Sequence, residues 1–558
     1  GETTMPYNQY TTTLDEFIWD MNAETVTFIT DEDKYGAFTS IHPNQDSLQF
    51  QGQSAFYDLK TNQLIIGGVP KILSADAYVY PDSGSVEIRE GGVMATLENA
   101  KIVANTENQY HVINKATVRI SGKKDYKASG FYEYNIGPRK QEIEFANIVG
   151  QRIGKGKRSE KATETRAMGE VKAEDNFYID HKTEFRGQIT LNATSKNLKF
   201  DGFAKLDAPK MTGADWFTIS SEADKKNLII AFDEPKTYNG DPVRTGVFLS
   251  KERGIAYPRV MMPTYFRKDR SIIDARGFFR YDPEGDRFLF GDSLKIVSDA
   301  NRGRLLVYKN EDASVYAEGP LTIAGGVDNV KVTSAGTLST SFDPDKNNKL
   351  TARTMTGIKM GIPEKLVKMM IIDIKSSSFD TNPIDYNADK EGFYTQTLSE
   401  FIPDNKSLAN TVENMKAGAF KLPKKYDNFT FLFSNLPLSW DPDYQSFVSS
   451  TNRLGLASID GETINSNLLA FVEFKMPSNE DDRVYVYIKS PSDYYYFFGY
   501  KQGILSIGSN NQRFNDELAG MKSKELTVKG DNGETYEIQP VDTATAERFV
   551  RRIQAAKK

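Results

Sequence analysis

Short stretches in which apolar and polar residues alternate dominate the chain from about residue 45 to residue 350. Clear examples are Val86-Glu87-Ile88 and Val118-Arg119-Ile120. Turn-forming residues interrupt them at short intervals, as in Asp82-Ser83-Gly84. No helical pattern of ten or more residues is evident in this region. Regular short strands without helices between them predict an all-β body over residues 41–355.

An internal repeat supports this prediction. Residues 128–135 and 275–282 share the pattern A-x-G-F-aromatic-x-Y-[ND], and a third copy lies around Tyr57 and Asp58. Aligning Tyr57 with Tyr281 brings further identical residues together without a gap: Asp58/Asp282, Gly67/Gly291, Lys71/Lys295, Ile72/Ile296 and Ser74/Ser298. Each copy reads as a strand, an Asx-type turn, a second strand and an apolar pair. One such unit cannot bury its apolar face alone, so we expect the copies to stack.

The two ends of the chain differ from this body. We expect residues 1–40 to form a lead-in with a short helix over 14–19, capped by Thr13. Phe17, Ile18 and Trp19 would dock this helix onto the rest of the chain. Residues 356–558 predict an α+β domain that ends in an amphipathic helix over 543–558. Its other expected helices are 364–373, 410–416 and 514–521. Its expected strands are 430–433, 468–474, 484–488 and 494–498. The predicted fold class is mainly β: stacked short-strand repeats, as a β-solenoid or an elongated β-sandwich or jelly roll, followed by this α+β domain.

Composition excludes several classes of protein. The 558 residues include no cysteine, which rules out disulfides, thiolate nucleophiles and cysteine-ligated metals. The 70 basic and 76 acidic residues give a net charge of −6, which argues against nucleic-acid binding. No apolar run approaches the roughly 18 residues of a membrane-spanning helix.

The sequence offers no legible catalytic site and no cofactor site. The P-loop, the nucleophile elbow, the HExxH motif and the dinucleotide fingerprint are all missing. His42, His111 and His181 share no ligand spacing, and we expect ordinary structural roles for them. Asp385, Asn387 and Asp389 have the D-x-N-x-D spacing of a calcium loop, but Lys390 and Gln396 stand where an EF-hand needs glycine and glutamate. Residues 343–347 fail in the same way, and solvated turns are the better interpretation of both segments.

Two further features suggest ligands. A basic loop at about 150–172 includes a candidate contact for phosphate or a lipid headgroup, with a solvated loop as the alternative; its residues are Arg152, Lys155, Lys157 and Arg158. Trp216, Trp440 and the aromatic run 494–500 could stack on sugar rings. The run is apolar on both strand faces, however, so a buried central strand with 484–488 as its hairpin partner is the alternative.

Short D-[ST]-aliphatic or D-[ST]-Ala motifs occur at Ser47, Ser293 and Thr543. They resemble the acceptor sequence that Bacteroidota use for O-glycosylation of exported proteins. Longer strings are similar to a family of very large, uncharacterised cell-envelope proteins of Bacteroidota, of which this chain would be a C-terminal portion. They are Ser74-Ala75-Asp76-Ala77, Tyr110-His111-Val112-Ile113, Tyr126-Lys127-Ala128-Ser129-Gly130, Leu438-Ser439-Trp440 and Tyr495-Tyr496-Phe497. The family has no established activity, so the resemblance implies no catalytic residues. The repeats also loosely resemble the stacked β-folds of lipopolysaccharide-transport proteins, in architecture only.

These observations favour a non-enzymatic scaffold or interaction protein of the cell envelope, exported to the periplasm or associated with the outer membrane or cell surface. Its partner would be another envelope protein or a glycolipid. One alternative is a lipid or glycolipid carrier, in which an apolar groove of the β-body lies beside the basic loop. Another is a carbohydrate-binding or glycoside-active protein, which needs exposed aromatic residues beside acidic ones.

Overall fold

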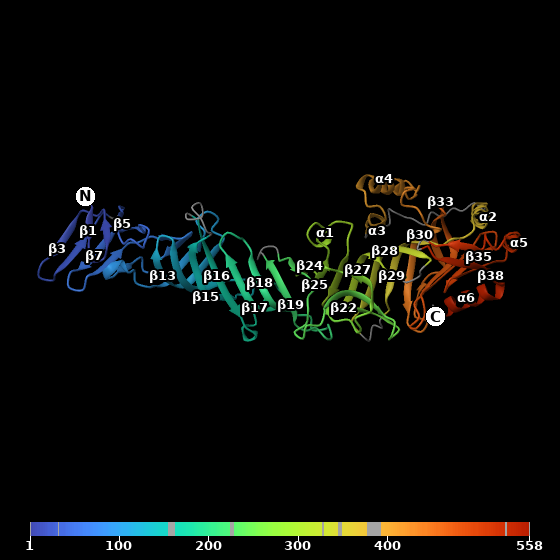
Figure 1. The fold of residues 1–558 in the computed structure, drawn as a ribbon, viewed down its shortest axis with the longest axis horizontal. Helices are drawn as coiled ribbons and strands as arrows, with labels where there is room; N and C mark the ends of the chain where they lie inside the picture. The colour runs from blue at the N-terminus through green and yellow to red at the C-terminus, as the bar shows by residue number, and fades with distance from the viewer. Residues whose placement is uncertain are drawn as a thin grey trace. The chain divides into compact units, whose positions relative to one another are not determined.

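A computed structural model describes residues 2–31, 33–153, 162–223, 228–325, 329–343, 349–376, 392–530 and 533–556. The fold is mainly β, as the sequence predicts, with helices concentrated in the C-terminal part (Figure 1). The chain divides into two compact units. Unit 1 contains Gly1–Asp207 and Thr218–Ala231, and unit 2 contains Ala208–Phe217 and Phe232–Lys558.

The main sheet of unit 1 is long and antiparallel. In sheet order its strands are β1 (Thr3–Met5), β2 (Tyr10–Thr12), β5 (Gly36–Ser40), β6 (Gln49–Gly52), β9 (Ile72–Ser74), β10 (Ala77–Tyr80), β12 (Leu97–Ala104), β13 (His111–Gly122), β14 (Asp125–Glu133), β15 (Glu142–Arg152), β16 (Thr163–Val171), β17 (Thr183–Asn192), β18 (Leu198–Leu206) and β19 (Phe217–Ala223). From β12 to β18, each strand pairs antiparallel with the next along the chain. The solenoid form of the prediction is therefore wrong for this sheet, because corresponding strands of successive solenoid coils pair in parallel.

Alternation along each strand explains why this sheet folds. On β13, Val118 and Ile120 are buried, whereas Arg119 between them is exposed on the opposite face. The buried face is occupied by the protein's own aromatic side chains. Tyr132 packs against Phe145, Tyr134 against Phe200, and Phe185 against Phe200, with ring centroids 5.3–6.1 Å apart.

A second, five-stranded sheet completes unit 1. Its order is β11 (Val86–Ile88), β8 (Gln63–Gly67), β7 (Ser54–Asp58), β4 (Thr25–Phe28) and β3 (Phe17–Asp20). The short helix expected over 14–19 is wrong, because Phe17–Asp20 is a strand that pairs with Thr25–Phe28. The 3-10 turns Glu90–Gly92 and Ala173–Asp175 connect strands of this unit.

The repeat copies share a strand followed by a polar turn. In two of them the expected Asx turn is confirmed, because Asp58 and Asp282 each accept the N–H two residues further on. The repeat glycine has a steric reason in each of two copies. A Cβ on Gly130 would lie 2.7 Å from Ile113 Cγ2, and Gly277 has φ +100°. The apolar pair that ends each copy varies in structure. It lies in strands β9 and β15 in two copies, whereas in the last copy Ile296 ends the short helix α1 (Ser293–Ile296) and Val297 follows it.

Unit 2 also has one long sheet. Its strands are β24 (Gly277–Asp282), β25 (Arg287–Gly291), β26 (Leu305–Lys309), β27 (Ser314–Leu321), β28 (Lys331–Ser341), β29 (Thr351–Lys359), β30 (Phe431–Asp441), β31 (Ser446–Ser449), β32 (Arg453–Ile459), β33 (Glu462–Lys475), β34 (Arg483–Lys489), β35 (Tyr495–Lys501), β36 (Ile504–Ser509), β38 (Thr535–Pro540) and β37 (Thr527–Lys529). A three-stranded sheet has the order β22 (Ile255–Met262), β21 (Arg244–Ser250), β23 (Arg270–Asp274). The short strand β20 (Ile230–Phe232) lies where the chain passes into unit 2. Because β29 pairs with both β28 and β30, the main sheet runs through the boundary expected at residue 356.

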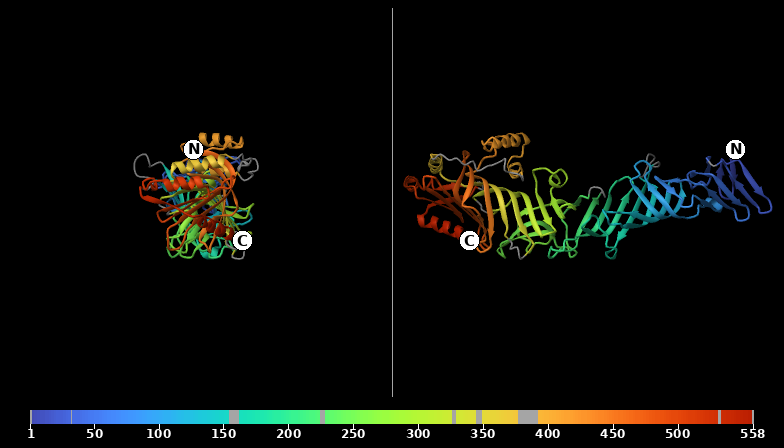
Figure 2. Two further views of the ribbon diagram at one scale, coloured as in Figure 1. Left: turned by 90° about the vertical axis from the view of Figure 1, so that its right-hand side faces the viewer. Right: turned by 180° about the vertical axis from the view of Figure 1, so that it is seen from behind.

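The helices after residue 360 form close to where the sequence places them. They are α2 (Glu364–Lys375), α3 (Phe393–Phe401), α4 (Asn405–Lys416), α5 (Gln512–Gly520) and α6 (Thr543–Ala556), of which α3 was not predicted. In Figure 2, as in Figure 1, α4 lies above the sheet of unit 2 and α6 lies below α4. Helices α3 and α4 pack around Met355 and Leu432, and α6 packs through Phe549 and Ile553 onto Phe471 and Tyr487. In the described part of the chain, no helix is long and apolar enough to cross a membrane.

Candidate interaction surface

The described residues of the predicted ligand sites are accounted for by contacts within the chain. His111 is buried between Tyr132 Oη, at 3.2 Å, and the Ser195 carbonyl, at 2.7 Å. His42 Nδ1 accepts the N–H of Asn44 at 3.1 Å. The calcium candidates Asp385, Asn387 and Asp389 lie outside the described residues. Among the residues that are described, no group of three or more His, Asp or Glu side chains could hold a metal ion.

The basic loop is described only at its two ends. Lys155, Lys157 and Arg158 lie outside the described residues. Arg152 forms an ion pair with Asp46 at 2.5 Å. At the other end Arg166 pairs with Glu164 at 2.8 Å. Both described arginines are therefore already engaged by acidic residues of unit 1.

The aromatic candidates for sugar stacking belong largely to the core. Tyr495 and the aromatic residues after it in β35 are buried, and the predicted hairpin of β34 with β35 is confirmed. Trp440 is only 7% exposed, whereas Trp216 is half-buried. Tyr494, just before the strand, is the one member of the run that reaches solvent appreciably, at 38%. By contrast, the three candidate glycosylation residues, Ser47, Ser293 and Thr543, are all exposed.

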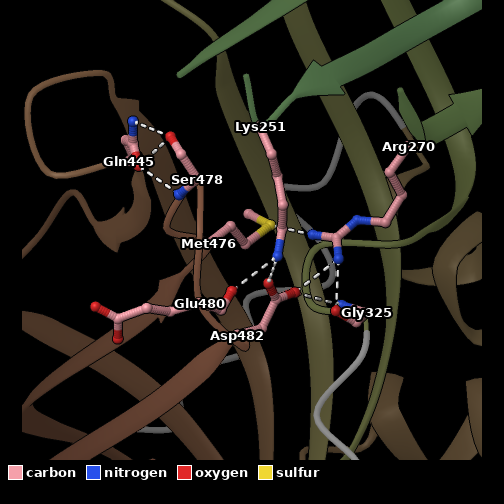
Figure 3. A network of polar contacts seen from close by, with 8 residues as sticks. All are labelled: Lys251, Arg270, Gly325, Gln445, Met476, Ser478, Glu480 and Asp482. Carbon is pink, nitrogen blue, oxygen red and sulfur yellow. Dashed lines mark hydrogen bonds and ion pairs between the residues drawn. The ribbon is translucent and has the colours of Figure 1, made fainter. Parts of the chain in front are cut away.

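A buried charged cluster in unit 2 connects its two sheets (Figure 3). Asp482, whose side chain is 1% exposed, forms ion pairs with Lys251 at 2.8 Å and with Arg270 at 2.6 Å. It also accepts the N–H of Gly325 at 3.2 Å. Arg270 lies on β23, Lys251 follows β21, and Asp482 immediately precedes β34. Because each charge has an opposite partner within the chain, the geometry is that of a structural tie between the sheets.

Unit 2 also has open grooves with charged linings. One, of about 810 Å³, has a mixed lining whose charged residues are Lys331, Lys359, Glu364, Asp460 and Lys529. A second, of about 610 Å³, carries Arg244, Asp274, Arg276, Asp292 and Arg304. An acyl chain needs an apolar lining, so neither groove suits one.

The most distinctive surface lies on unit 1, at strand β3. In the order β11-β8-β7-β4-β3, one side of β3 pairs with β4, and no strand of the described chain pairs with its other side. Phe17, Ile18 and Trp19 are 55%, 61% and 58% exposed, so the expectation that they dock onto the rest is wrong. Within unit 1, Figure 1 shows β3 beyond β1 and β7, with no labelled element outside it.

One face of β3 continues the buried face of its sheet. Phe17 stands opposite Phe28, and their ring centroids are 5.7 Å apart. Trp19 stands opposite Val26, which in turn pairs with the buried Tyr57. The apolar layer that Phe28 and Tyr57 bury therefore extends outward to side chains that no described residue covers.

The opposite face of β3 is apolar at its centre. Ile18 stands opposite Thr27, and the next strand places Phe56 beyond Thr27, 40% exposed. A strand with apolar residues on both faces is typical of the interior of a sheet rather than its edge. Edge strands of soluble proteins usually carry lysine, proline or a bulge that prevents further pairing, and Phe17-Ile18-Trp19-Asp20 has none of these.

The backbone of β3 has hydrogen-bonding groups directed at the open edge. Ile29 donates its N–H to the Glu16 carbonyl at 3.2 Å, which sets the alternation of the hairpin. By that alternation the peptide groups of Ile18 face β4, whereas those of Phe17 and Trp19 face outward. Asp20 holds the hairpin turn, because its Oδ1 accepts the N–H groups of Asn22 and Ala23 at 2.9 Å each.

The surroundings of β3 are acidic. Residues 1–33 include eight carboxylates and no lysine or arginine: Glu2, Asp15, Glu16, Asp20, Glu24, Asp31, Glu32 and Asp33. Glu16 and Asp20 flank the three apolar residues of β3 and are exposed. The sequence signal that could have identified this surface is the run of three large apolar residues inside a segment that lacks any positive charge.

No protein-family model matches this chain, and no curated protein matches it.

Proposed function

We propose that this chain is a non-enzymatic scaffold of the cell envelope that binds a protein partner by strand addition at β3. One observation carries the proposal. The edge strand β3 has exposed apolar side chains on both of its faces, and it has peptide groups that face outward. An added strand would cover Phe17 and Trp19 and pair with their N–H and C=O groups. Strand addition of this kind gives affinity through main-chain bonds and specificity through alternate side chains. The long antiparallel sheets of the two units would give the scaffold extended surfaces.

Covering the apolar side chains at this edge would contribute favourably to a contact, in addition to the main-chain hydrogen bonds of an added strand. An aromatic side chain buries about 150–250 Å² when fully covered, so two that are half-exposed offer on the order of 200 Å². At roughly 25 cal/mol per Å², covering Phe17 and Trp19 contributes about 5 kcal/mol before the entropic cost of association.

The two alternative functions have less support. A lipid carrier needs an open apolar cavity, but the inner face of the main sheet of unit 1 is occupied by residues such as Phe145, Phe185 and Phe200, all at most 1% exposed. Native mass spectrometry of the protein from its own membrane fraction tests this, since a bound lipid would revive the carrier. The residues named as candidates for sugar stacking are mostly buried, so a carbohydrate site built from them has little support.

Location in the envelope rests on the resemblance of the strings and of the D-[ST] motifs. The exposure of Ser47, Ser293 and Thr543 leaves all three open to a modifying enzyme. We expect peptides from the protein purified from its native host to carry a glycan mass at one or more of these residues. Unmodified peptides at all three would remove this support for export.

The interaction itself is tested by site-specific photo-crosslinking in the native host. A photoreactive phenylalanine analogue at Trp19 is expected to give one defined protein adduct. The same analogue at Met168, which is 44% exposed on β16, is the matched control and should give none. Phe17→Pro removes an outward-facing N–H without removing a bond to β4, and should abolish the adduct. Equal adducts at positions 19 and 168, or none at either, would refute strand addition.

A further inference from the structure

We infer that the strand accepted at β3 is a basic one: an antiparallel segment of another protein with apolar residues opposite Phe17, Ile18 and Trp19, and Lys or Arg opposite Glu16 and Asp20. This inference rests on the proposed function, which states that β3 accepts a strand, and adds the chemistry of the partner.

For an added strand that runs antiparallel, the backbone of β3 limits the register to alternate positions. Because the peptide groups of Phe17 and Trp19 face outward, two partner residues exchange hydrogen bonds with them, and one residue between those two lies opposite Ile18. Side chains alternate between the faces of a strand, so Glu16, Ile18 and Asp20 lie on one face and Phe17 and Trp19 on the other. The partner residues that flank its three apolar positions therefore lie on the same face as the two carboxylates.

Positive charges within the chain do not outnumber the carboxylates around Glu16 and Asp20. Two basic residues on adjoining segments pair with other acids: Lys34 with Asp31 at 2.5 Å, and Lys60 with Glu24 at 3.8 Å. Lys34 also acts on Glu16 through its charge. Directly opposite side chains of an antiparallel pair have Cβ atoms about 5 Å apart, close enough for opposite charges to attract and like charges to repel. A basic flank on the added strand thus meets a carboxylate at each end, in a segment, residues 1–33, that carries eight acidic residues and no lysine or arginine.

The same charges disfavour a second copy of this chain as the occupant. In the two-fold antiparallel register that brings all three apolar residues together, Phe17 of one copy meets Trp19 of the other and Ile18 meets Ile18. That register also places Glu16 opposite Asp20 twice. Like charges directly opposite each other destabilise a strand pair, so the acidic flanks act against self-association.

This reasoning gives a test that needs no known partner. Glu16→Lys makes the edge self-complementary, because Lys then stands opposite Asp20 at both ends of the two-fold pair. We expect the wild-type protein to sediment as a monomer and the Glu16→Lys variant to dimerise in a concentration-dependent way at low salt. Glu16→Gln is the control, since it removes the charge without supplying the opposite one, and it should dimerise at least tenfold more weakly. Adding Phe17→Pro to Glu16→Lys should restore the monomer.

A second measurement uses two labelled peptides on the wild-type protein, followed by fluorescence anisotropy. The sequence Lys-Val-Ile-Val-Lys should bind at least tenfold more tightly than Glu-Val-Ile-Val-Glu, with the difference reduced in high salt. Equal binding of both peptides would overturn the inference about charge and leave strand addition standing. Failure of both peptides, together with a monomeric Glu16→Lys variant, would overturn both proposals. Dimerisation of the wild type would identify a second copy as the occupant and overturn the basic partner.

Discussion

The ion pair between Glu473 and Arg552 holds helix α6 against the sheet of unit 2, and breaking it has a calculable cost. Glu473 lies on β33 with its side chain fully buried, and Arg552, on α6, is 27% exposed. Ser446 also donates its hydroxyl to Glu473 at 2.9 Å. The change we consider is Arg552→Met, which keeps an apolar stem beside Tyr485 and Phe549 but removes the cation.

Removing one partner of a buried pair leaves an uncompensated charge, which typically costs about 3–5 kcal/mol of stability. Since Arg552 is partly exposed, water can reach that side of the pair, and we expect the lower end, about 3 kcal/mol at neutral pH. The double variant Glu473→Gln/Arg552→Met removes both charges of the pair and keeps an acceptor for the Ser446 hydroxyl. It should lie within about 1 kcal/mol of the wild type, because neutral replacements of buried pairs are well tolerated.

The deficit should depend on pH with a defined sign. Burial raises the pKa of Glu473 even with Arg552 present, and loss of the cation raises it further. Between the ordinary glutamate pKa of about 4.3 and this raised value, the folded protein binds more protons than the unfolded one. Stability therefore falls as pH rises through that window. The Arg552→Met deficit should be smallest below about pH 4 and larger at pH 7.5.

Urea unfolding at pH 4 and pH 7.5 measures this stability deficit. The fluorescence of Trp440 reports on the sheet of unit 2, and Trp19→Phe and Trp216→Phe remove the other two tryptophans from the signal. Hydrogen exchange over α6 separates local release of the helix from unfolding of the unit. A single variant that loses no more stability than the double variant, or a deficit that is independent of pH, would refute the assigned role of the pair.

Three further predictions concern unit 1. Trp19→Ser should change its unfolding free energy by no more than about 0.5 kcal/mol, because the side chain is 58% exposed; a larger loss in urea unfolding would mean that β3 supports the fold. Gly130→Val should cost about 1–3 kcal/mol or more, since its Cβ would lie 2.7 Å from Ile113 Cγ2, and an unchanged thermal midpoint would contradict this close contact. Asp180 is fully buried and its pKa is raised by burial, so the stability it contributes is lost as pH rises through that pKa. Asp180→Asn should flatten the pH dependence of unfolding measured between pH 4 and pH 8.

Much of the secondary structure could be predicted, because local patterns determine it. The amphipathic spacing of Phe549 and Ile553 predicted α6, and the two-faced apolar run from Tyr495 predicted a central strand with β34 beside it. The Asx turns at Asp58 and Asp282 followed from residue type alone. The way the strands pair in the sheets did not follow from residue type. Short strands in antiparallel and in stacked arrangements have the same alternation of apolar and polar residues, and only the long-range pairing of strands distinguishes the two.

The error over residues 14–19 has a specific origin. Leu14, Phe17 and Ile18 have helical spacing, and Thr13 is a plausible cap, so the local pattern favours a helix. The alternative strand is stabilised by the hairpin with Thr25–Phe28, whose turn is held by the Asp20 carboxylate. That pairing partner lies beyond the window in which helical periodicity is judged. The error also concealed the surface, because a docked helix would have buried Trp19.

Buried and exposed features of this molecule point to function in opposite ways. Asp482 lies among cations in an arrangement that resembles a binding site. Its ion pairs with Lys251 and Arg270 neutralise its charge, however, and the cluster connects the two sheets of unit 2. At β3 the reverse holds: Phe17, Ile18 and Trp19 lack cover on both faces, and the peptide groups beside them lack a strand within the described chain. A folded chain gains free energy by covering such groups, so an edge that keeps them exposed is explained best by an occupant from outside. The acidic residues Glu16 and Asp20 then do two things at once, since they keep copies of this chain apart and favour a basic strand.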